Sequence, residues 1–238
     1  MRKVALMCVA TFVGALGITA VASAIQGTQT VSLSLQNRNA GTKAKPRSVG
    51  KLTVVTTTTP VAGEPPFATS RAVIHFDKNI VFGSSKFPSC SQTVVQSDPT
   101  KCPSGSKVGS GSATAVPSTG GQVLPKIAAY NSSNGKKILL LVTEPTFQVK
   151  SVLVGTLKTD TGKYGRKLDV AIPANLQNVG GIVVTLTKFT TIVGGTRKGT
   201  PFVGLKGCSG GKLAVKGDFF FTDNTSKSAT TTSNCRRS

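Results

Sequence analysis

The 238-residue sequence has no tryptophan, only two tyrosines and a single histidine. Proteins that bind nucleic acids or sugars commonly stack bases or rings on aromatic side chains, so this shortage argues against a specific nucleic-acid partner and a sugar-binding platform. Acidic residues are also scarce: eight stand against 29 Lys and Arg, and the formal net charge is +21. A field of this sign attracts anionic polymers and anionic surfaces.

The first 24 residues are typical of a secretory signal peptide. Arg2 and Lys3 precede an uncharged stretch, and Ala22-Ser23-Ala24 matches the small-residue pattern that signal peptidase cleaves. We expect cleavage after Ala24, which lowers the net charge from +21 to +19. An uncleaved anchor helix is the alternative, since about 20 apolar residues can span a bilayer. Cys8 lies too near the start of the stretch for a lipoprotein, and no later segment is apolar enough to cross a membrane.

Four cysteines follow the signal segment, namely Cys90, Cys102, Cys208 and Cys235. An even number in an exported chain predicts disulfides, and four cysteines allow three pairings. We predict 90–102, because Asp98 and Pro99 turn the chain between them and Pro103 follows, and 208–235, because these two flank a terminal hairpin. Closing loops of this size stabilises a fold by about 3 kcal/mol each. Zinc is not expected, because there is no C-x₂-C pair and only one histidine.

The hydrophobic pattern predicts strands throughout. Thr and Val are abundant, Gly and Pro recur every 8 to 15 residues, and no helix-length window shows a 3.6-residue apolar stripe. The small side chains of 107–116 suggest a bulge or a closely approaching neighbour, and the apolar run 138–142 suggests a central strand covered on both faces. Asn134-Gly135 predicts a hairpin before that run. The expected strands are 30–35, 52–58, 71–77, 107–116, 138–142, 149–157, 167–172, 182–193, 202–205 and 212–221.

These strands predict an all-β, antiparallel two-sheet sandwich as a single domain over 25–238. A closed β-barrel is the alternative. No linker rich in Pro and Ser divides the middle of the chain.

Few residues suggest catalysis. Gly207-Cys208-Ser209-Gly210-Gly211 matches the G-x-S-x-G pattern of serine hydrolases, but that motif needs a helix after the serine, and here a strand is expected. His75 shares a strand face with Asp77, a pair that can orient an imidazole but is more often a solvated surface pair. Among the eight acids, Glu144 and Asp169 have no turn nearby to explain them. The acids form no cluster that could hold calcium. We therefore predict no catalytic residue, no metal site and no cofactor.

Several stretches resemble a group of uncharacterised secreted β-rich proteins of high-GC Gram-positive bacteria. The most specific is the run from Cys102-Pro103 to Lys107-Val108-Gly109; Phe87-Pro88-Ser89-Cys90, Gly162-Lys163-Tyr164-Gly165 and the segment from Cys208 to Cys235 are also similar. The resemblance implies export and a shared β-fold but transfers no activity. One departure is Gly207, where that group has a proline before the cysteine.

We therefore expect an exported, non-enzymatic domain that is secreted or associated with the cell envelope and is held by charge to anionic cell-wall or membrane polymers. The alternative is a secreted hydrolase of envelope lipid or glycan that uses His75 with Ser209 or a pair of carboxylates. A third possibility is a subunit of a surface assembly.

Overall fold

The computed structural model describes residues 27–60 and 68–237, so the expected signal segment and Cys8 lie outside the described residues. Strands dominate, as expected for an all-β chain. In β1 the alternating residues Val31, Leu33 and Leu35 are buried while their neighbours face outward. The strands are β1 (Thr28–Leu35), β2 (Arg47–Ser48), β3 (Lys51–Thr59), β4 (Thr69–Asp77), β5 (Ile80–Phe82), β6 (Lys107–Pro117), β7 (Lys126–Ser132), β8 (Lys137–Glu144), β9 (Val149–Thr159), β10 (Tyr164–Ala171), β11 (Asn178–Val179), β12 (Ile182–Gly194), β13 (Thr196–Arg197), β14 (Thr200–Pro201), β15 (Val203–Leu205), β16 (Lys212–Phe221) and β17 (Ser226–Asn234).

Helical segments are short. They are α1 (Gln92–Ser97), α2 (Ala174–Gln177) and three 3-10 turns, η1 (Ser84–Lys86), η2 (Pro99–Lys101) and η3 (Ser133–Gly135). None of the helices in the described ranges is long and apolar enough to cross a membrane. In η3, Asn134 and Gly135 have positive φ angles and join β7 to β8, which confirms the predicted hairpin.

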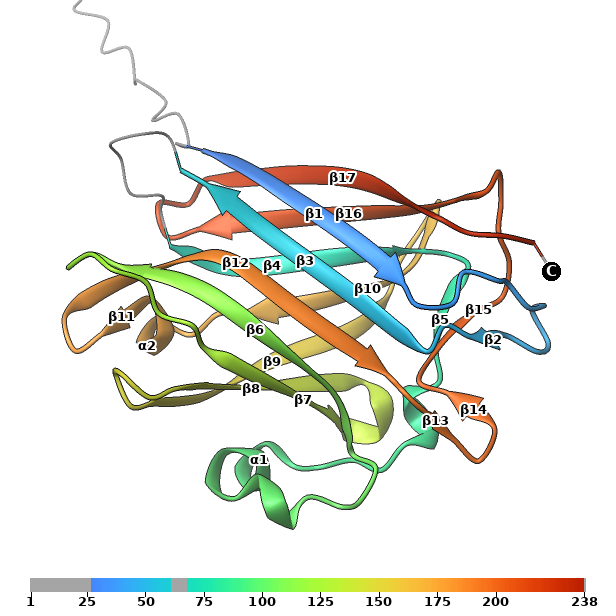
Figure 1. The fold of residues 1–238 in the computed structure, drawn as a ribbon, viewed down its shortest axis with the longest axis horizontal. Coiled ribbons are helices and arrows are strands. Elements are labelled where there is room, and N and C mark those ends of the chain that lie inside the picture. The colour runs from blue at the N-terminus through green and yellow to red at the C-terminus, as the bar shows by residue number, and fades with distance from the viewer. Residues whose placement is uncertain (1–26, 61–67, 238) are drawn as a thin grey trace, which may run out of the picture.

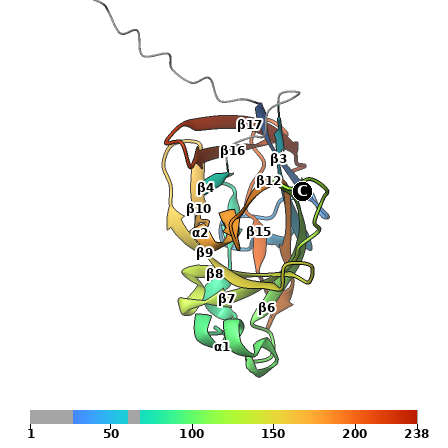
Figure 2. The same cartoon turned by 90° about the vertical axis from the view of Figure 1, so that its left-hand side faces the viewer.

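Twelve strands form one antiparallel sheet in the order β1-β3-β12-β6-β7-β8-β9-β10-β4-β16-β17, with β11 paired to β12. Figure 1 shows β1, β3, β12 and β6 in front, and β9, β10, β4 and β16 behind them. The view from the side shows the two walls curving into each other (Figure 2). The sheet is therefore a flattened barrel that is nearly closed.

The barrel is closed by packing at one seam. The end strands β1 and β17 lie side by side, and β1 also touches β16, but no backbone ladder joins β1 to either strand within the described residues. Val31 of β1 packs against Gly217 of β16, where a Cβ atom would lie 3.4 Å from it. The side chain of Lys227 donates a hydrogen bond across the seam to the carbonyl of Gly27.

The two-sheet sandwich that we expected is not what the strands form. One continuous sheet bends round instead, which supports the barrel alternative in part. Inward and outward residues alternate in the same way in both architectures, so the period-two pattern does not distinguish them.

Glycines make the bend at β6 possible. A Cβ atom on Gly109 would lie 2.1 Å from the carbonyl oxygen of Ile192, and one on Gly111 would lie 2.0 Å from that of Thr190. Register shifts occur on both sides of this strand, between Lys107 and Gly109 and, in β12, between Leu186 and Lys188. The close approach and the bulge suggested by the small side chains are both confirmed.

Strand β8 is covered on both faces, as expected. Ile138, Leu140 and Val142 belong to the core inside the barrel. Leu139 and Leu141 face outward and pack under α1 with Val95, Tyr130 and Cys90. The helix begins after Ser91, whose hydroxyl accepts a hydrogen bond from Val94 N–H.

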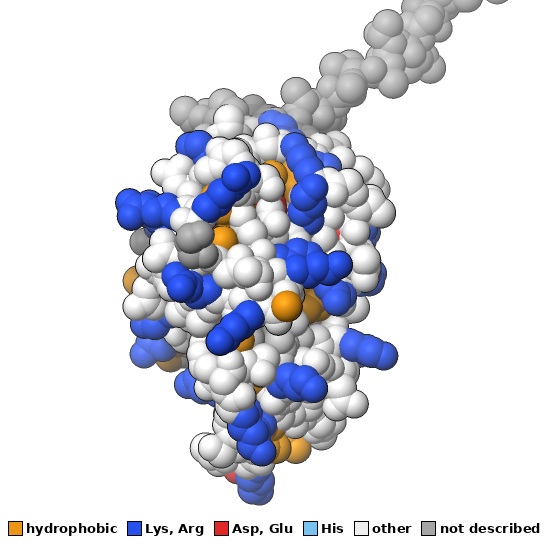
Figure 3. All heavy atoms as spheres, turned by 90° about the vertical axis from the view of Figure 1, so that its right-hand side faces the viewer, with side chains coloured by type: hydrophobic (Ala, Val, Ile, Leu, Met, Phe, Trp, Pro, Cys, Tyr) orange, Lys and Arg blue, Asp and Glu red, His pale blue; other side chains and the backbone are white. Residues whose placement is uncertain are grey.

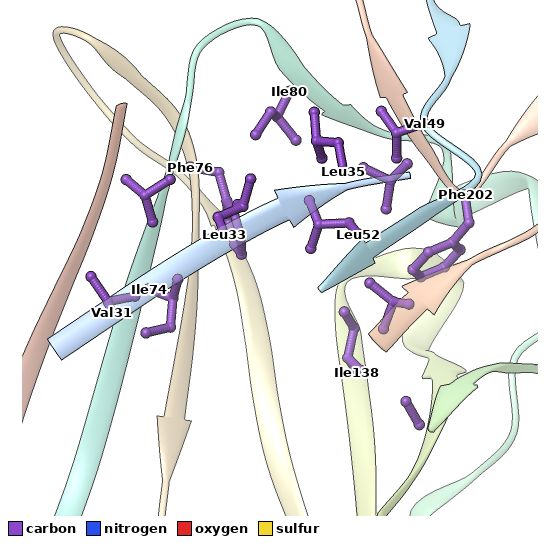
Figure 4. Close-up of a cluster of buried hydrophobic side chains, with 14 of the residues drawn as sticks. Val31, Leu33, Leu35, Val49, Leu52, Ile74, Phe76, Ile80, Ile138 and Phe202 are labelled. Carbon is purple, nitrogen blue, oxygen red and sulfur yellow. The ribbon is translucent and has the colours of Figure 1, made fainter. Parts of the chain in front are cut away.

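A small sheet of order β2-β15-β5 closes the end of the barrel at which β1 and β12 finish. Phe202, Ile80 and Val49 fill the space between this sheet and the barrel strands, and each is at most 1% exposed (Figure 4). From outside, the same end of the molecule carries scattered Lys and Arg side chains with few acidic side chains among them (Figure 3).

Candidate functional site

The barrel interior holds an apolar cavity of about 180 Å³. Its walls are the inward residues of nearly every barrel strand, such as Ala72, Ile74 and Phe76 of β4 and Ile138 and Leu140 of β8. Well-packed interiors leave few voids larger than a water molecule, so a space of this size is a departure from normal packing. Engineered cavities of about 150 Å³ with apolar walls stay dry and bind benzene.

Small side chains create this space. Ala72, Ala113 and Ala115 point inward at positions where a larger apolar residue would fill the interior. Val54 and Phe189 also line the cavity; they pack against the core on one side but are only half-buried. The large number of barrel strands has the same effect, since the diameter of a barrel grows with strand number.

The cavity extends away from the closed end toward the opposite end of the barrel, where β3, β6 and β8 finish. We call this end the mouth. There β12 pairs with β6 from Val184 onward but with β3 only from Lys188 onward. The α2–β11 segment lies at this place, and its Leu176, Gln177 and Val179 line the cavity. Gln177 Nε2 donates to the carbonyl of Ile172, which fixes the segment to the end of β10.

Polar groups at the mouth already have partners. Thr58 Oγ1 lies 2.9 Å from Gln29 Nε2 and 3.0 Å from Gln29 Oε1, so the two side chains hydrogen-bond to each other. Glu144 accepts hydrogen bonds from the backbone N–H groups of Thr146 and Phe147. Burial raises the pKa of Glu144, but these bonds outweigh it and hold the pKa below its ordinary value. Glu144, unexplained from sequence, therefore holds the β8–β9 turn.

The second cluster of polar side chains lies on the outer face of the opposite wall, around His75. Its Nδ1 lies 2.5 Å from Asp160 and its Nε2 lies 2.9 Å from Asp218. Both ring nitrogens of His75 therefore face carboxylate oxygens. Two lysines add positive charge: Lys216 Nζ lies 2.9 Å from an Asp218 oxygen, and Lys167 Nζ lies 3.8 Å from an Asp160 oxygen.

The two carboxyls respond to this environment in the same way. Burial raises the pKa of Asp160, but the hydrogen bonds from His75 and from the backbone N–H of Thr161, together with nearby positive charge, more than offset it, so the pKa lies below its ordinary value. Burial also raises the pKa of Asp218, and the hydrogen bonds from Ser228, Lys216 and His75 again lower it further than burial raises it. Both groups are therefore stable as carboxylates beside the ring.

His75 does not pair with Asp77. The Asp77 carboxylate accepts hydrogen bonds from Asn79 on one oxygen and from Ala214 N–H on the other. Asp77 is 7% exposed, and the His75 side chain is 12% exposed, so the solvated surface pair that we considered is also wrong. The two side chains share a strand face but bind different partners: Asp77 binds Asn79 and Ala214, and His75 binds Asp160 and Asp218.

Ser209 lies in an exposed turn that leads directly into β16, without the helix of a nucleophile elbow. The turn is held by the disulfide between Cys208 and Cys235, and Cys90 pairs with Cys102, so both predicted pairings are confirmed. Asp169 has a structural explanation: Arg71 and Lys158 bind its two oxygens. Within the described ranges, no group of three His, Cys, Asp or Glu side chains is placed to hold a metal ion.

The cavity was not anticipated from the sequence. Its only signals are the inward alanines and threonines, which alternate with exposed residues in the same way as larger core residues do. A period-two pattern shows which residues face inward but not how far apart the two walls stand.

These features define the structural class: a nearly closed, disulfide-stabilised antiparallel barrel with an apolar interior. No protein-family model matches the chain, and no curated protein or solved structure is significantly similar to it.

Proposed function

We propose that the barrel binds an apolar ligand, such as a fatty acyl chain, in its interior. The observation that carries this proposal is the cavity of about 180 Å³ with apolar walls. Binding pockets are typically concave, mostly apolar and equipped with a few polar groups that orient the ligand. At the mouth, the lining includes the polar side chains of Gln29, Thr58 and Gln177, which bond within the protein and would have to share or exchange those bonds to orient a ligand.

The charged residues at the cavity favour a ligand whose buried part is uncharged. Both oxygens of Glu144 are engaged by backbone N–H groups, and the side chain of Lys188 is exposed at the mouth. A charge buried without a partner is costly, so a charged head group would stay at the mouth while its hydrocarbon part enters.

The compartment is part of the proposal. Disulfides persist mainly in oxidising compartments, and the two in this protein hint at an environment outside the cytoplasm. With the signal-like segment over residues 1–24, they support a secreted or envelope-associated carrier of apolar molecules. A hydrolase is the second candidate function; it would use His75, which two carboxylates hold, or Ser209, which lies in an exposed turn.

Binding of N-phenyl-1-naphthylamine, a neutral dye that fluoresces in apolar surroundings, tests the proposal. We expect saturable fluorescence that palmitic acid displaces, and a rise in the melting temperature with ligand. At a ligand concentration 100 times Kd the stabilisation is about 2.7 kcal/mol.

Ala113→Leu fills the cavity and should weaken dye binding at least tenfold without lowering the melting temperature. Ala171→Leu is the matched control, because Ala171 is exposed and does not line the cavity. Equal dye binding by both variants, or no saturable binding by the natural protein, contradicts the proposal.

A further inference from the structure

Three large apolar side chains are exposed on the described surface, and they lie together at the mouth. Leu124 is 63% exposed, Val183 47% and Val116 37%. The bridge between Ala115 and Val123 places Leu124 diagonally across from Val116. The hydrogen bond from Ser118 N–H to the carbonyl of Val183 places Val183 diagonally across from Val116 on the other side. We call these three residues the apolar rim.

The apolar rim is the outer face of the cavity wall. Ala115, Val123 and Val184 are the chain neighbours of the rim residues, and all three line the cavity. Whatever the rim touches therefore lies beside the mouth.

The rim lies in a positively charged surface. Lys188 is paired with Thr114, the residue two positions before Val116, and Lys126 follows Leu124 by two positions. Both lysines are exposed. The four strands of this wall, β1, β3, β6 and β12, contain no Asp or Glu. Of their three lysines, Lys188 lies near the rim, whereas Lys51 and Lys107 lie toward the closed end of the barrel.

Exposed apolar side chains flanked by lysines are the chemistry of a lipid interface: the apolar groups enter the boundary between head groups and acyl chains, and the lysines meet anionic head groups. Three side chains are too few for a stable protein interface, which typically covers about 800 Å² on each partner. Charge also disfavours a second copy of this chain, since its net charge is +21.

We propose that the apolar rim docks the barrel on an anionic lipid bilayer, beside which the cavity takes up its ligand. The uptake step rests on the function proposed above, whereas docking stands on the rim and its lysines alone. If the barrel docks on a bilayer, its ligands are molecules that partition into membranes. The anionic partner that the net charge predicts is then a lipid surface and not a cell-wall polymer.

The absence of tryptophan makes a clean test possible. Leu124→Trp places a single indole in the rim, and Thr230→Trp places one at an exposed position on β17. With vesicles of phosphatidylglycerol we expect a blue shift of the fluorescence for Leu124→Trp and none for Thr230→Trp. With phosphatidylcholine vesicles, or at 1 M salt, the shift should be lost, because salt screens exposed charges within about 3 Å at that concentration.

Cosedimentation with phosphatidylglycerol vesicles separates the contributions. Val183→Ser with Leu124→Ser, and separately Lys126→Glu with Lys188→Glu, should each reduce the bound fraction at least tenfold. Lys43→Glu with Lys45→Glu makes the same change in net charge at two exposed positions outside the rim and should reduce it far less.

Equal losses in the two charge variants, or equal shifts for both indoles, would overturn docking by the rim. A doubled mass in size-exclusion chromatography that Leu124→Ser abolishes would also overturn it, in favour of a second copy. Dye binding in solution without vesicles reports on the cavity alone, so failure of docking and failure of the cavity function are distinguishable.

Discussion

The Nδ1 atom of His75 lies 2.5 Å from a carboxylate oxygen of Asp160, which is 85 positions away in the chain. With Asp218 at the other ring nitrogen, His75 joins β4 to the β9–β10 turn and to β16. This bridge ties three separate segments of the back wall together on its outer face.

Replacing the ring tests the bridge. His75→Gln keeps one donor and should raise the pKa values of Asp160 and Asp218 toward the ordinary value of 3.8. Because the pKa values of Asp160 and Asp218 are lower in the folded state, the two carboxylates stabilise the fold above pH 3.8. This stability is lost as pH falls through their folded-state pKa values. The variant should unfold at a higher pH on acidification and lose about 1–2 kcal/mol at pH 7. Carboxyl titration by NMR and acid unfolding measure this, with the exposed Lys163→Gln as control. Unchanged titration of both acids would contradict the bridge.

The ion pairs of Asp169 should make a second acid-sensitive contribution to the stability of the fold. The hydrogen bond from Arg71, opposed by burial and supported by Lys158, lowers the pKa of Asp169 from 3.8 to about 2. The stability that it contributes is complete above pH 3.8 and disappears as pH falls toward 2. Arg71 and Lys158 are half-exposed, so solvent screening limits the contribution to about 1 kcal/mol. Asp169→Asn should lower the free energy of unfolding by this amount at pH 7 and by only a small part of it at pH 2, as measured by urea unfolding at both pH values.

Removing either disulfide should lower the free energy of unfolding by an amount that depends on the length of the loop it closes. The sequence separations are 12 and 27 residues, for which the loop-entropy model gives about 3 and about 3.5 kcal/mol. Paired Cys→Ser variants, compared by urea unfolding, test both values. Loss of the Cys208–Cys235 bond should also free the hairpin of β16 and β17, measured as faster amide exchange in β17. Similar exchange in both variants would contradict this.

Gly111 tests the close approach of β6 and β12. Gly111→Ala places a Cβ atom 2.0 Å from the carbonyl oxygen of Thr190, so the strands must separate. We expect a loss of about 1–3 kcal/mol in thermal or urea unfolding. Ser110→Ala on the same strand is exposed and should change stability by less than about 0.5 kcal/mol. If Gly111→Ala lowers stability no more than Ser110→Ala does, the two strands can separate without strain and the assignment is wrong.

The Asn131 side chain holds the segment that leads into the disulfide loop against the barrel. Its Nδ2 donates to the carbonyls of Ser84, Phe87 and Pro88, and the residue is fully buried. Asn131→Asp sets a carboxylate against these three oxygens and should destabilise the fold by about 3 kcal/mol or more. Asn131→Ala, which removes the donor without adding charge, should cost less. The reverse order in urea unfolding would contradict this assignment.

The strands and the disulfides could be predicted because their signals are local. Alternation in β1 and β4, and the hairpin between Cys208 and Cys235, depend on neighbouring residues and on even cysteine number. Strand β7 was not predicted, because its last residues read as the turn before Ile138. Its Ile127 and Ala129 belong to the core inside the barrel, and its Tyr130 packs under α1.

The tertiary arrangement could not be predicted from the sequence, because it depends on the register between strands that are distant in the chain. Asp160 and Asp218 meet His75 only because β10 and β16 flank β4 in one particular register. The barrel and its cavity depend on the curvature of the sheet, which arises from bulges such as the one between Leu186 and Lys188. Alternation cannot place such a bulge.

The contact of β1 with β17 has a consequence for behaviour in concentrated solution. Each of these strands ends the sheet, and a free sheet edge is a template on which another chain can add a strand. Here the two edges cover each other. Self-association by strand addition must therefore first part them, which gives the molecule protection against fibril formation that its net charge reinforces.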